Sequence, residues 1–253
     1  MLHALALYRR YSSVELRSSL LPRRYIENPL LMKRHKFHLR VYILCIGALR
    51  VFVFEKMLIL IAAHEYDLTD TDNIYGHLTN TARAAESEHF DERKFVKVLE
   101  DLTEYICSER PDLAIDRDAA NHIVVKMKKD IFSITQELFK AFENEYTVFA
   151  PMTNCFEIFG LDFMVDEELN VSLLEVNPGP DFKQTGGKLK NVISELWEQT
   201  LQLVLDDNQD VERIRNLNQK RTFEPMQKAT QDFTCVYSKE SSTSHLESGM
   251  KLV

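Results

Sequence analysis

Glycine is scarce in this chain, with 7 glycines among 253 residues, where average usage is about 7%. The phosphate-binding sequences GxGxxG and GxxxxGKS/T are both absent. Such sequences need glycine because the backbone must approach the phosphates closely. The composition therefore argues against a nucleotide site built on a glycine-rich loop.

Paired cysteines are also lacking, because the four cysteines are far apart and form no CxxC sequence. Three of them lie in apolar patterns. We therefore expect buried free thiols of a reducing compartment, the cytoplasm, and neither a disulfide framework nor a zinc site. The four residues are Cys45, Cys107, Cys155 and Cys235.

Positive charge is in deficit, with a formal net charge of −8. This argues against a general nucleic-acid-binding protein, since neutralising phosphates requires a surplus of Lys and Arg. The charge is uneven, because residues 1–56 hold 11 Lys and Arg against 3 Asp and Glu. This basic part is either a surface for an anion, such as a nucleotide or an acidic peptide, or an ordinary solvated face.

A long uncharged apolar run is missing as well. The most apolar segment, Val41–Ala63, contains Arg50, Glu55 and Lys56, and each charge costs roughly 3 kcal/mol near the centre of a membrane helix. We expect no membrane association. Residues 1–24 have no small-residue cleavage site after an apolar run, so we expect no signal peptide, although their Arg- and Ser-rich composition is also typical of a mitochondrial presequence.

Hydrophobic patterns predict an α+β fold. Three strands are expected in the apolar segment and two more around a polar turn at 166–170; they are Val41–Ile46, Leu49–Phe54, Met57–Ala62, Phe156–Val165 and Val171–Val176. Residues 64–88 are expected to be a long loop. Helices are predicted over 91–107, beginning at an Asp91 N-cap, over about 117–148 and over 188–205. The helices would pack on a mostly antiparallel sheet made from 36–62 and 156–177.

Oxygen-bearing side chains are concentrated in the predicted hairpin. Glu175 and Asn177 are two residues apart on a strand, so they point to the same side. Asp162 lies in the preceding strand, where a carboxylate is costly to bury unpaired. Two carboxylates and an amide oxygen suit Mg²⁺, which completes its octahedron with phosphate and water. The alternative is an edge hairpin with one solvated face.

Four motifs follow one another along the chain. They are KFHLRVY at 36–42, HLTN at 77–80, FEIFGLDFMVD at 156–166 and LEVNPGPDF at 174–182. Together they resemble the tubulin–tyrosine ligase family, and their wording is most similar to fungal members. The resemblance covers roughly residues 23–205.

The resemblance implies an ATP-grasp ligase. Such an enzyme phosphorylates a carboxylate with ATP, and an amine then attacks the acyl phosphate to give an amide and ADP. Family members add tyrosine, glutamate or glycine to tubulin. The implied cofactors are ATP and Mg²⁺, and the implied partners are a tubulin C-terminal tail and a free amino acid.

The resemblance also implies roles for individual residues. Asp162, Glu175 and Asn177 would hold Mg²⁺ on the ATP phosphates. Lys36 and Arg40, which share a strand face, would neutralise phosphate charge, with Arg40 taking part in catalysis. Hinge and loop residues would contact the nucleotide or acceptor; these are Tyr25, Ile26, His77, Leu78, Thr79 and Asn80.

The chain also departs from the family pattern. The family has a nucleotide-grasping half before the hinge, and residues 1–22 are too few and too dissimilar to form it. We therefore expect an N-terminally truncated catalytic domain over 23–207, followed by a polar, disordered tail over 208–253. His38 stands where the family tends to carry Asp, and Leu60 stands where it usually carries an Arg near the reacting carboxylate.

Two hypotheses for the function follow. The first is an ATP- and Mg²⁺-dependent carboxylate–amine ligase, with weak activity expected from these 253 residues alone. The second is a non-catalytic interaction protein on an incomplete ATP-grasp scaffold, which would bind its partner through the helices of 91–150. Binding of Mg·ATP that is lost in Asp162→Ala or Glu175→Ala would distinguish them.

Overall fold

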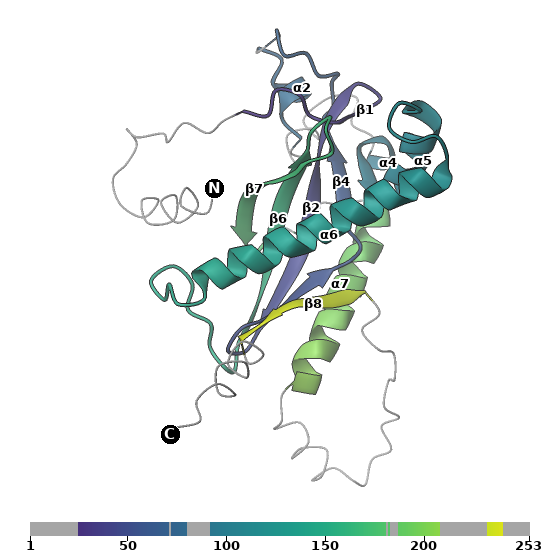
Figure 1. Ribbon diagram of the computed structural model, residues 1–253. Coiled ribbons are helices and arrows are strands. Elements are labelled where there is room, and N and C mark those ends of the chain that lie inside the picture. Colours follow the sequence, from purple (N-terminus) through teal and green to yellow (C-terminus); the bar gives the residue numbers. More distant parts are fainter. Residues whose placement is uncertain are drawn as a thin grey trace, which may run out of the picture.

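The computed structural model describes residues 25–70, 72–79, 92–180, 182, 187–207 and 232–239. Within these ranges, eight strands form one sheet with antiparallel pairing throughout (Figure 1). The strands are β1 (Leu31–Met32), β2 (His35–Ile46), β3 (Arg50–Phe54), β4 (Leu58–Ile61), β5 (Val96–Val98), β6 (Phe156–Val165), β7 (Val171–Pro178) and β8 (Phe233–Ser238). The helices are α2 (Ile74–His77), α4 (Glu92–Phe95), α5 (Asp101–Glu109), α6 (Arg117–Phe142) and α7 (Gly187–Asp207). The predicted α+β class is confirmed.

Strand β2 organises the sheet because it pairs along both of its edges. One edge pairs with β4 through Phe37–Arg40 and with β3 through Ile43–Ile46, and the other pairs with β6 through Leu39–Ile46. The apolar segment 41–63 therefore forms strands, as predicted. In the part of the chain that the structure describes, no helix combines the length and the apolar character needed to cross a membrane.

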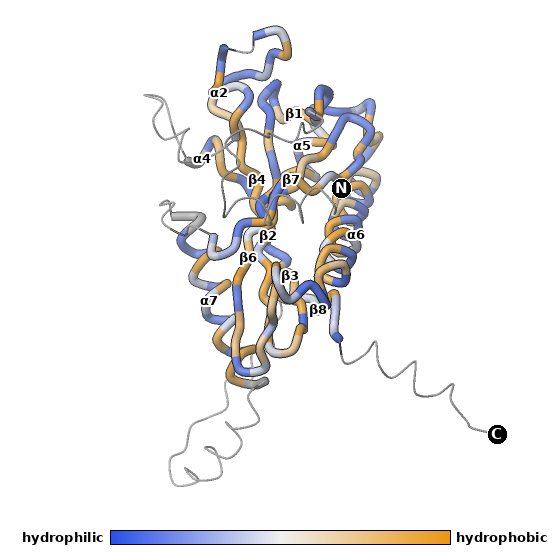
Figure 2. The backbone as a smooth tube through the Cα atoms, turned by 90° about the vertical axis from the view of Figure 1, so that its left-hand side faces the viewer, coloured by the Kyte–Doolittle hydropathy of each residue, from blue (hydrophilic) through white to orange (hydrophobic). Residues whose placement is uncertain are grey.

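The sheet has two faces with different covers. Side chains of β2 alternate, so its odd-numbered residues from Phe37 to Cys45 join a core with α5 and α6. Its even-numbered residues Tyr42, Leu44 and Ile46 join a smaller apolar cluster with Val192 of α7. Figure 2 shows α6 and α7 on opposite sides of the sheet. The remaining even-numbered positions of β2, which are Lys36, His38 and Arg40, therefore lie on the α7 face, beyond its apolar end.

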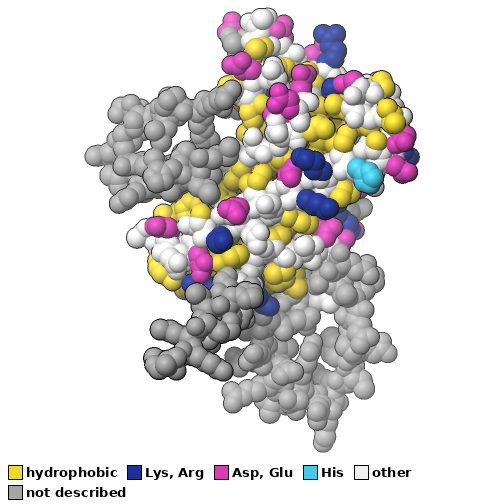
Figure 3. Space-filling view, viewed as in Figure 1, with side chains coloured by type: hydrophobic (Ala, Val, Ile, Leu, Met, Phe, Trp, Pro, Cys, Tyr) yellow, Lys and Arg dark blue, Asp and Glu magenta, His cyan; other side chains and the backbone are white. Residues whose placement is uncertain are grey.

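Helix α6 matches the helix predicted over about 117–148, although it ends earlier. Asp116 caps its N-terminus by accepting a hydrogen bond from the backbone N–H of Ala119 at 2.8 Å. Met127 and Ile131 are fully buried against the sheet, and each such side chain contributes about 1.5–3 kcal/mol of hydrophobic stabilisation. The face over which α6 runs shows charged side chains of both signs (Figure 3). The outer surface of this helix is therefore an ordinary solvated one.

The helix predicted over 91–107 is wrong in its middle, where strand β5 separates α4 from α5. Val96 and Val98 of this strand pair with Leu60 and Leu58 of β4. The carboxylate of Asp101 accepts the N–H of Val98 at 3.2 Å and so ends the strand. Pairing with the edge of β4 outweighs the local helical spacing of apolar residues.

Residues 233–238 form strand β8, so the prediction of a disordered tail is wrong for these residues. The strand pairs with β3 and covers that edge of the sheet. The ammonium of Lys56 lies 2.5 Å from Glu195 of α7 and 3.0 Å from Asp232, so the strand is tied to the body at its start. The rest of 208–253 and all of 1–22 lie outside the described residues, so the domain division stays a prediction.

The cysteines are free thiols, as predicted. Cys45 is buried, but Cys107, Cys155 and Cys235 are exposed, so burial was predicted wrongly for three of them. Cys107 shows the reason, because it follows the fully buried Ile106 on α5 and points away from the core. Apolar neighbours in sequence therefore do not bury a residue that lies on the other side of a helix.

Candidate functional site

The 156–177 hairpin forms around a turn that the sequence dictates. The carboxylate of Asp166 accepts the backbone N–H groups of Glu168 at 3.0 Å and Asn170 at 2.8 Å. Leu169 takes a positive φ of 65° to close the turn. This turn sets the register of β6 against β7 as far as Phe163, which pairs with Leu173. A shift in register between Asp162 and Phe163 then brings Glu175, and not Leu174, opposite Asp162.

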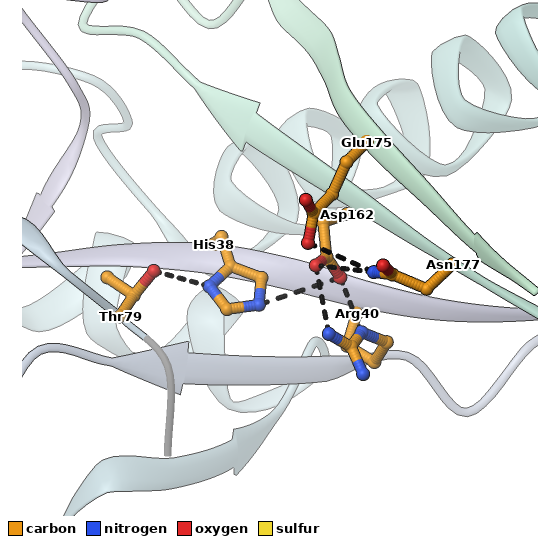
Figure 4. A network of polar contacts seen from close by, with 6 residues as sticks. All are labelled: His38, Arg40, Thr79, Asp162, Glu175 and Asn177. Atoms are coloured by element: carbon orange, nitrogen blue, oxygen red, sulfur yellow. Dashed lines mark hydrogen bonds and ion pairs between the residues drawn. The ribbon is translucent and has the colours of Figure 1, made fainter. Parts of the chain in front are cut away.

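That register brings the three predicted metal-binding side chains together. Asp162 pairs with Glu175, and Gly160 pairs with Asn177. The amide nitrogen of Asn177 lies 3.0 Å from a Glu175 oxygen and 3.4 Å from an Asp162 oxygen (Figure 4). Arg40 of β2 stands opposite Asp162 in the β2–β6 register. Three adjacent strands thus contribute one row of polar side chains.

Arg40 and Asp162 form a buried, two-point ion pair. The guanidinium Nε contacts one carboxylate oxygen, and its Nη2 lies 2.9 Å from the other. The exposed fractions of the two side chains are 14% and 6%. Burial alone would lower the pKa of Arg40, but the hydrogen bond and charge of Asp162 raise it above its usual value. Asp162 therefore already has a cation against it.

Gly160 leaves room for this arrangement. A Cβ at that position would lie 3.0 Å from Pro180 Cβ and 3.3 Å from Arg40 Cδ. Any side chain there would displace the stem of Arg40 or the residue that follows the hairpin. The close approach of Arg40 to the sheet therefore depends on this glycine.

Lys36 is a buried cation whose contacts are aromatic. Its ammonium donates to the Tyr25 hydroxyl at 2.9 Å, and it lies 4.4 Å from the centre of the Tyr25 ring and 5.6 Å from that of Tyr66. Only 5% of the residue is exposed. Burial lowers the pKa of Lys36 to about 8. Among the ion pairs of the described residues, none involves Lys36, so it keeps a charge that an anion can neutralise.

His38 lies between the loop after α2 and the carboxylate row. Its Nδ1 is 2.5 Å from the Thr79 hydroxyl, and its Nε2 is 3.6 Å from an Asp162 oxygen. That second distance is too long for a hydrogen bond, and Nε2 is buried with no hydrogen-bond partner. Burial, with the charges of Arg40 and Lys36, lowers the pKa of His38 to about 3, although Glu175 opposes the shift. The imidazole is therefore neutral at pH 7.

The residues of the predicted hinge and loop differ in their contacts and exposure. His77 hydrogen-bonds the Tyr25 hydroxyl at 2.9 Å through Nδ1 and the carbonyl of Asp70 at 2.9 Å through Nε2. Leu78 is 46% exposed, and Ile26 is partly buried beside the predicted hinge. Asn80 lies outside the described residues. The structure thus joins Tyr25, Lys36 and His77 in one group and Thr79 and His38 in a second.

The side-chain oxygens of Asp162, Glu175 and Asn177 fit Mg²⁺ only if other ligands complete its coordination. Within the described ranges, no three His, Cys, Asp or Glu side chains are arranged to hold a metal ion. The available donors are the two carboxylates and the Asn177 amide oxygen. Mg²⁺ usually takes one or two protein carboxylates and completes its shell with substrate phosphates and water. The residues therefore fit a metal that arrives with a nucleotide, and do not form an all-protein cage.

Sequence reasoning gave no role to two residues at the site. Tyr66 contacts Lys36 and packs against His77 with ring centres 5.3 Å apart. Its signal is an aromatic residue in an otherwise polar loop. Gly160 is the other, and its signal is a lone glycine within an apolar strand. Leu60, at the position where the resemblance implies an Arg, pairs with His38 and is 2% exposed in the apolar cluster, so it forms an apolar wall beside the site.

Comparison with known proteins identifies the family of the chain. The model of the tubulin-tyrosine ligase family matches residues 10–212. The chain belongs to the tubulin–tyrosine ligase family. It is 40% identical over 190 residues to a probable tubulin–tyrosine ligase, PBY1, of Saccharomyces cerevisiae, and 34% identical over 206 residues to a probable tubulin–tyrosine ligase of Schizosaccharomyces pombe. The alignments cover 70% and 80% of this chain, but 23% and 46% of those proteins.

A solved structure supports the ATP-grasp fold. The C-terminal domain of K. lactis Pby1, described as an ATP-grasp enzyme interacting with the mRNA decapping enzyme Dcp2, is 30% identical to this chain, with a TM-score of 0.56. The match covers 85% of this chain and 51% of that one. The chain therefore spans about half of the solved domain and half or less of the two fungal relatives. The roles of the site residues stay predictions.

Proposed function

We propose that the row on β2, β6 and β7 is the phosphate and metal site of an ATP- and Mg²⁺-dependent carboxylate–amine ligase. One observation carries this proposal. Two cations, Lys36 and Arg40, and two carboxylates, Asp162 and Glu175, lie on one face of the sheet, beyond the end of its apolar cover. Lys36 and Asp162 are buried and Arg40 is largely so, and charges in such places are costly to maintain without a polar ligand.

Each residue has a defined task in this proposal. Lys36 and Arg40 bind phosphate oxygens, and they neutralise charge during phosphoryl transfer. Asp162, Glu175 and Asn177 would hold Mg²⁺, which when bound neutralises phosphate charge and orients the transferred group. Tyr25 holds the Lys36 ammonium in place until a phosphate replaces the hydroxyl contact.

The acceptor is a protein carboxylate, and the second substrate is the amine of a free amino acid. The names of the fungal relatives, which are probable tubulin–tyrosine ligases, support tubulin as the acceptor, and the C-terminal tail is the part of it that we propose. Leu60 supplies no charge to such a tail, so the carboxylate must be recognised by other groups. Lys36 and Arg40 are candidates, because they lie on either side of His38, the β2 residue that pairs with Leu60.

Calorimetric titration of the chain with ATP in the presence of Mg²⁺ tests the proposal. Glu175→Ala is the informative variant, because Glu175 is exposed and its loss should leave the fold intact. Glu137→Ala, which removes an exposed acid from α6, is the matched control. The proposal requires binding in the wild type and the control and a loss in Glu175→Ala. Equal binding by all three would contradict the proposed site, and no binding by a folded wild-type chain would contradict the function.

A second candidate function is protein binding, and one observation favours it. The solved neighbour is described as interacting with the mRNA decapping enzyme Dcp2. We propose that this chain binds a decapping enzyme of the same type through its ligase-like domain. Co-elution of the purified chain with purified Dcp2 in size-exclusion chromatography tests this. Separate elution at micromolar concentrations would argue against it.

A further inference from the structure

His38 lies between the loop that follows α2 and the Arg40–Asp162 ion pair. Its ring joins Thr79, which follows α2, to Asp162, which lies on β6 (Figure 4). The side chain is 7% exposed, and its Nε2 is buried without a hydrogen-bond partner while it points towards Asp162. Buried polar nitrogens are normally hydrogen-bonded, so this one indicates a contact that is made in another state of the site.

The two contacts of the ring determine its tautomer. A neutral imidazole carries one proton, and the other nitrogen can only accept a hydrogen bond. A lone pair on Nε2 would face the negative oxygen of Asp162, which is unfavourable at 3.6 Å. The proton therefore belongs on Nε2, and Nδ1 accepts from the Thr79 hydroxyl. This leaves an N–H group aimed at the carboxylate.

Asp162 needs such a donor when Arg40 acts on a phosphate. In the structure, Arg40 binds both oxygens of Asp162. A guanidinium that turns towards a phosphate gives up at least one of these contacts. A shift of a few tenths of an ångström would bring the Nε2–H of His38 to hydrogen-bonding distance and keep the carboxylate oriented.

We propose that His38 is a positioning residue of the nucleotide site, which holds Asp162 through Nε2–H and ties the segment 72–79 to the site through Nδ1. The inference rests on the proposed function. It goes beyond that function because it assigns a separate task to each ring nitrogen. In this proposal, the two contacts of His38 couple the position of the segment 72–79 to the orientation of Asp162.

Two substitutions separate the nitrogens. The amide of His38→Asn reaches the position of Nδ1, and that of His38→Gln reaches the position of Nε2. Titration with ATP, once with Mg²⁺ and once with EDTA, gives the factor by which the metal strengthens binding. Loss of a group that orients a metal ligand typically weakens metal binding about 10–100-fold, so His38→Asn should lose a factor of that order. His38→Gln should lose much less. A general packing defect would weaken binding equally with Mg²⁺ and with EDTA.

Hydrogen exchange of the backbone amides of residues 72–79, measured without nucleotide, tests the second contact. Exchange should be faster in His38→Gln and in Thr79→Val, and close to wild type in His38→Asn. Thr79→Val alters only the loop side, so it remains informative if a His38 variant does not fold.

The outcomes separate this inference from the proposed function. If the wild type binds Mg·ATP, Glu175→Ala does not, and His38→Asn retains the full effect of Mg²⁺, the inference about Asp162 is wrong and the function stands. If the wild type binds no Mg·ATP, the function and the role of Nε2 both fall. Unchanged exchange in both His38→Gln and Thr79→Val overturns the role of Nδ1.

Discussion

The buried ion pair between Arg40 and Asp162 makes a prediction that needs no ligand. At 2.9 Å, Coulomb's law with an effective dielectric constant of ~20 gives an attraction of about 6 kcal/mol. Much of this only offsets the loss of hydration of the two groups. Removing one partner of a buried pair still costs about 3–5 kcal/mol, because the other charge stays buried. We expect Arg40→Met to lose about that much stability at pH 7.

The measurement is urea unfolding followed by circular dichroism, in buffer without metal or nucleotide. Asp162→Asn should also be strongly destabilising, because it leaves the guanidinium without its charged partner. The double variant Arg40→Met/Asp162→Asn should lose less than the sum of the single losses, with a coupling of up to about 3 kcal/mol. The cycle thus separates the pair from the packing of each side chain.

An exposed ion pair on α6 provides the control. The ammonium of Lys126 lies 2.8 Å from Asp130, with side-chain exposures of 63% and 36%. Surface pairs four residues apart on a helix contribute about 0.3–0.5 kcal/mol, so Lys126→Met should change stability by no more than that. If Arg40→Met costs as little as Lys126→Met, the reasoning about burial is refuted.

Three further predictions concern other parts of the molecule. Binding of ATP should draw a proton onto Lys36 near pH 8, because its lowered pKa rises beside phosphate. The affinity for ATP should therefore weaken as the pH rises through and above 8. Calorimetry in buffers of different ionisation enthalpy should show proton uptake on binding in the wild type but not in Lys36→Met. Gly160→Ala should weaken Mg·ATP binding through contacts with Pro180 and Arg40, and a wild-type affinity in titration would contradict this. Lys56→Met should increase hydrogen exchange in β8 by loosening its tie to Asp232, whereas unchanged exchange would show that pairing with β3 suffices.

The centre of the sheet was predictable because β2 and β6 are long and apolar. The hairpin was predictable too, and Asp162 does lie near Glu175 and Asn177. Its register at the site was not predictable from the 166–170 turn, because a shift between Asp162 and Phe163 brings Glu175, and not Leu174, opposite Asp162. The segment 91–107 was not predictable from local spacing. Its apolar residues fit both a helix and a strand–helix pair, and the edge of β4, which is distant in sequence, decides between them.

The contacts between the site residues were harder to predict from the sequence than the identity of those residues. Lys36 and Arg40 were expected on one strand face, and they are there, but nothing local to either residue shows that one pairs with Asp162 and the other with Tyr25. The role of Tyr66 arises from a loop that folds back over the strand. Such contacts depend on how separate segments meet in space, which a single sequence specifies only through the whole fold.

Charge balance gives a reason to expect that a metal ion and a nucleotide would bind together at the proposed site. Lys36, Arg40, Asp162 and Glu175 sum to zero, with His38 neutral. A divalent cation alone would compete with Arg40 for Asp162, and a polyphosphate alone would lie beside two carboxylates, so each faces a like charge. If both bound together, Asp162 and Glu175 would hold the cation, and the guanidinium of Arg40 and the ammonium of Lys36 would bind the phosphates. Each of the four charges would then keep an opposite neighbour, which is the condition under which charges as buried as Lys36, Arg40 and Asp162 are tolerated.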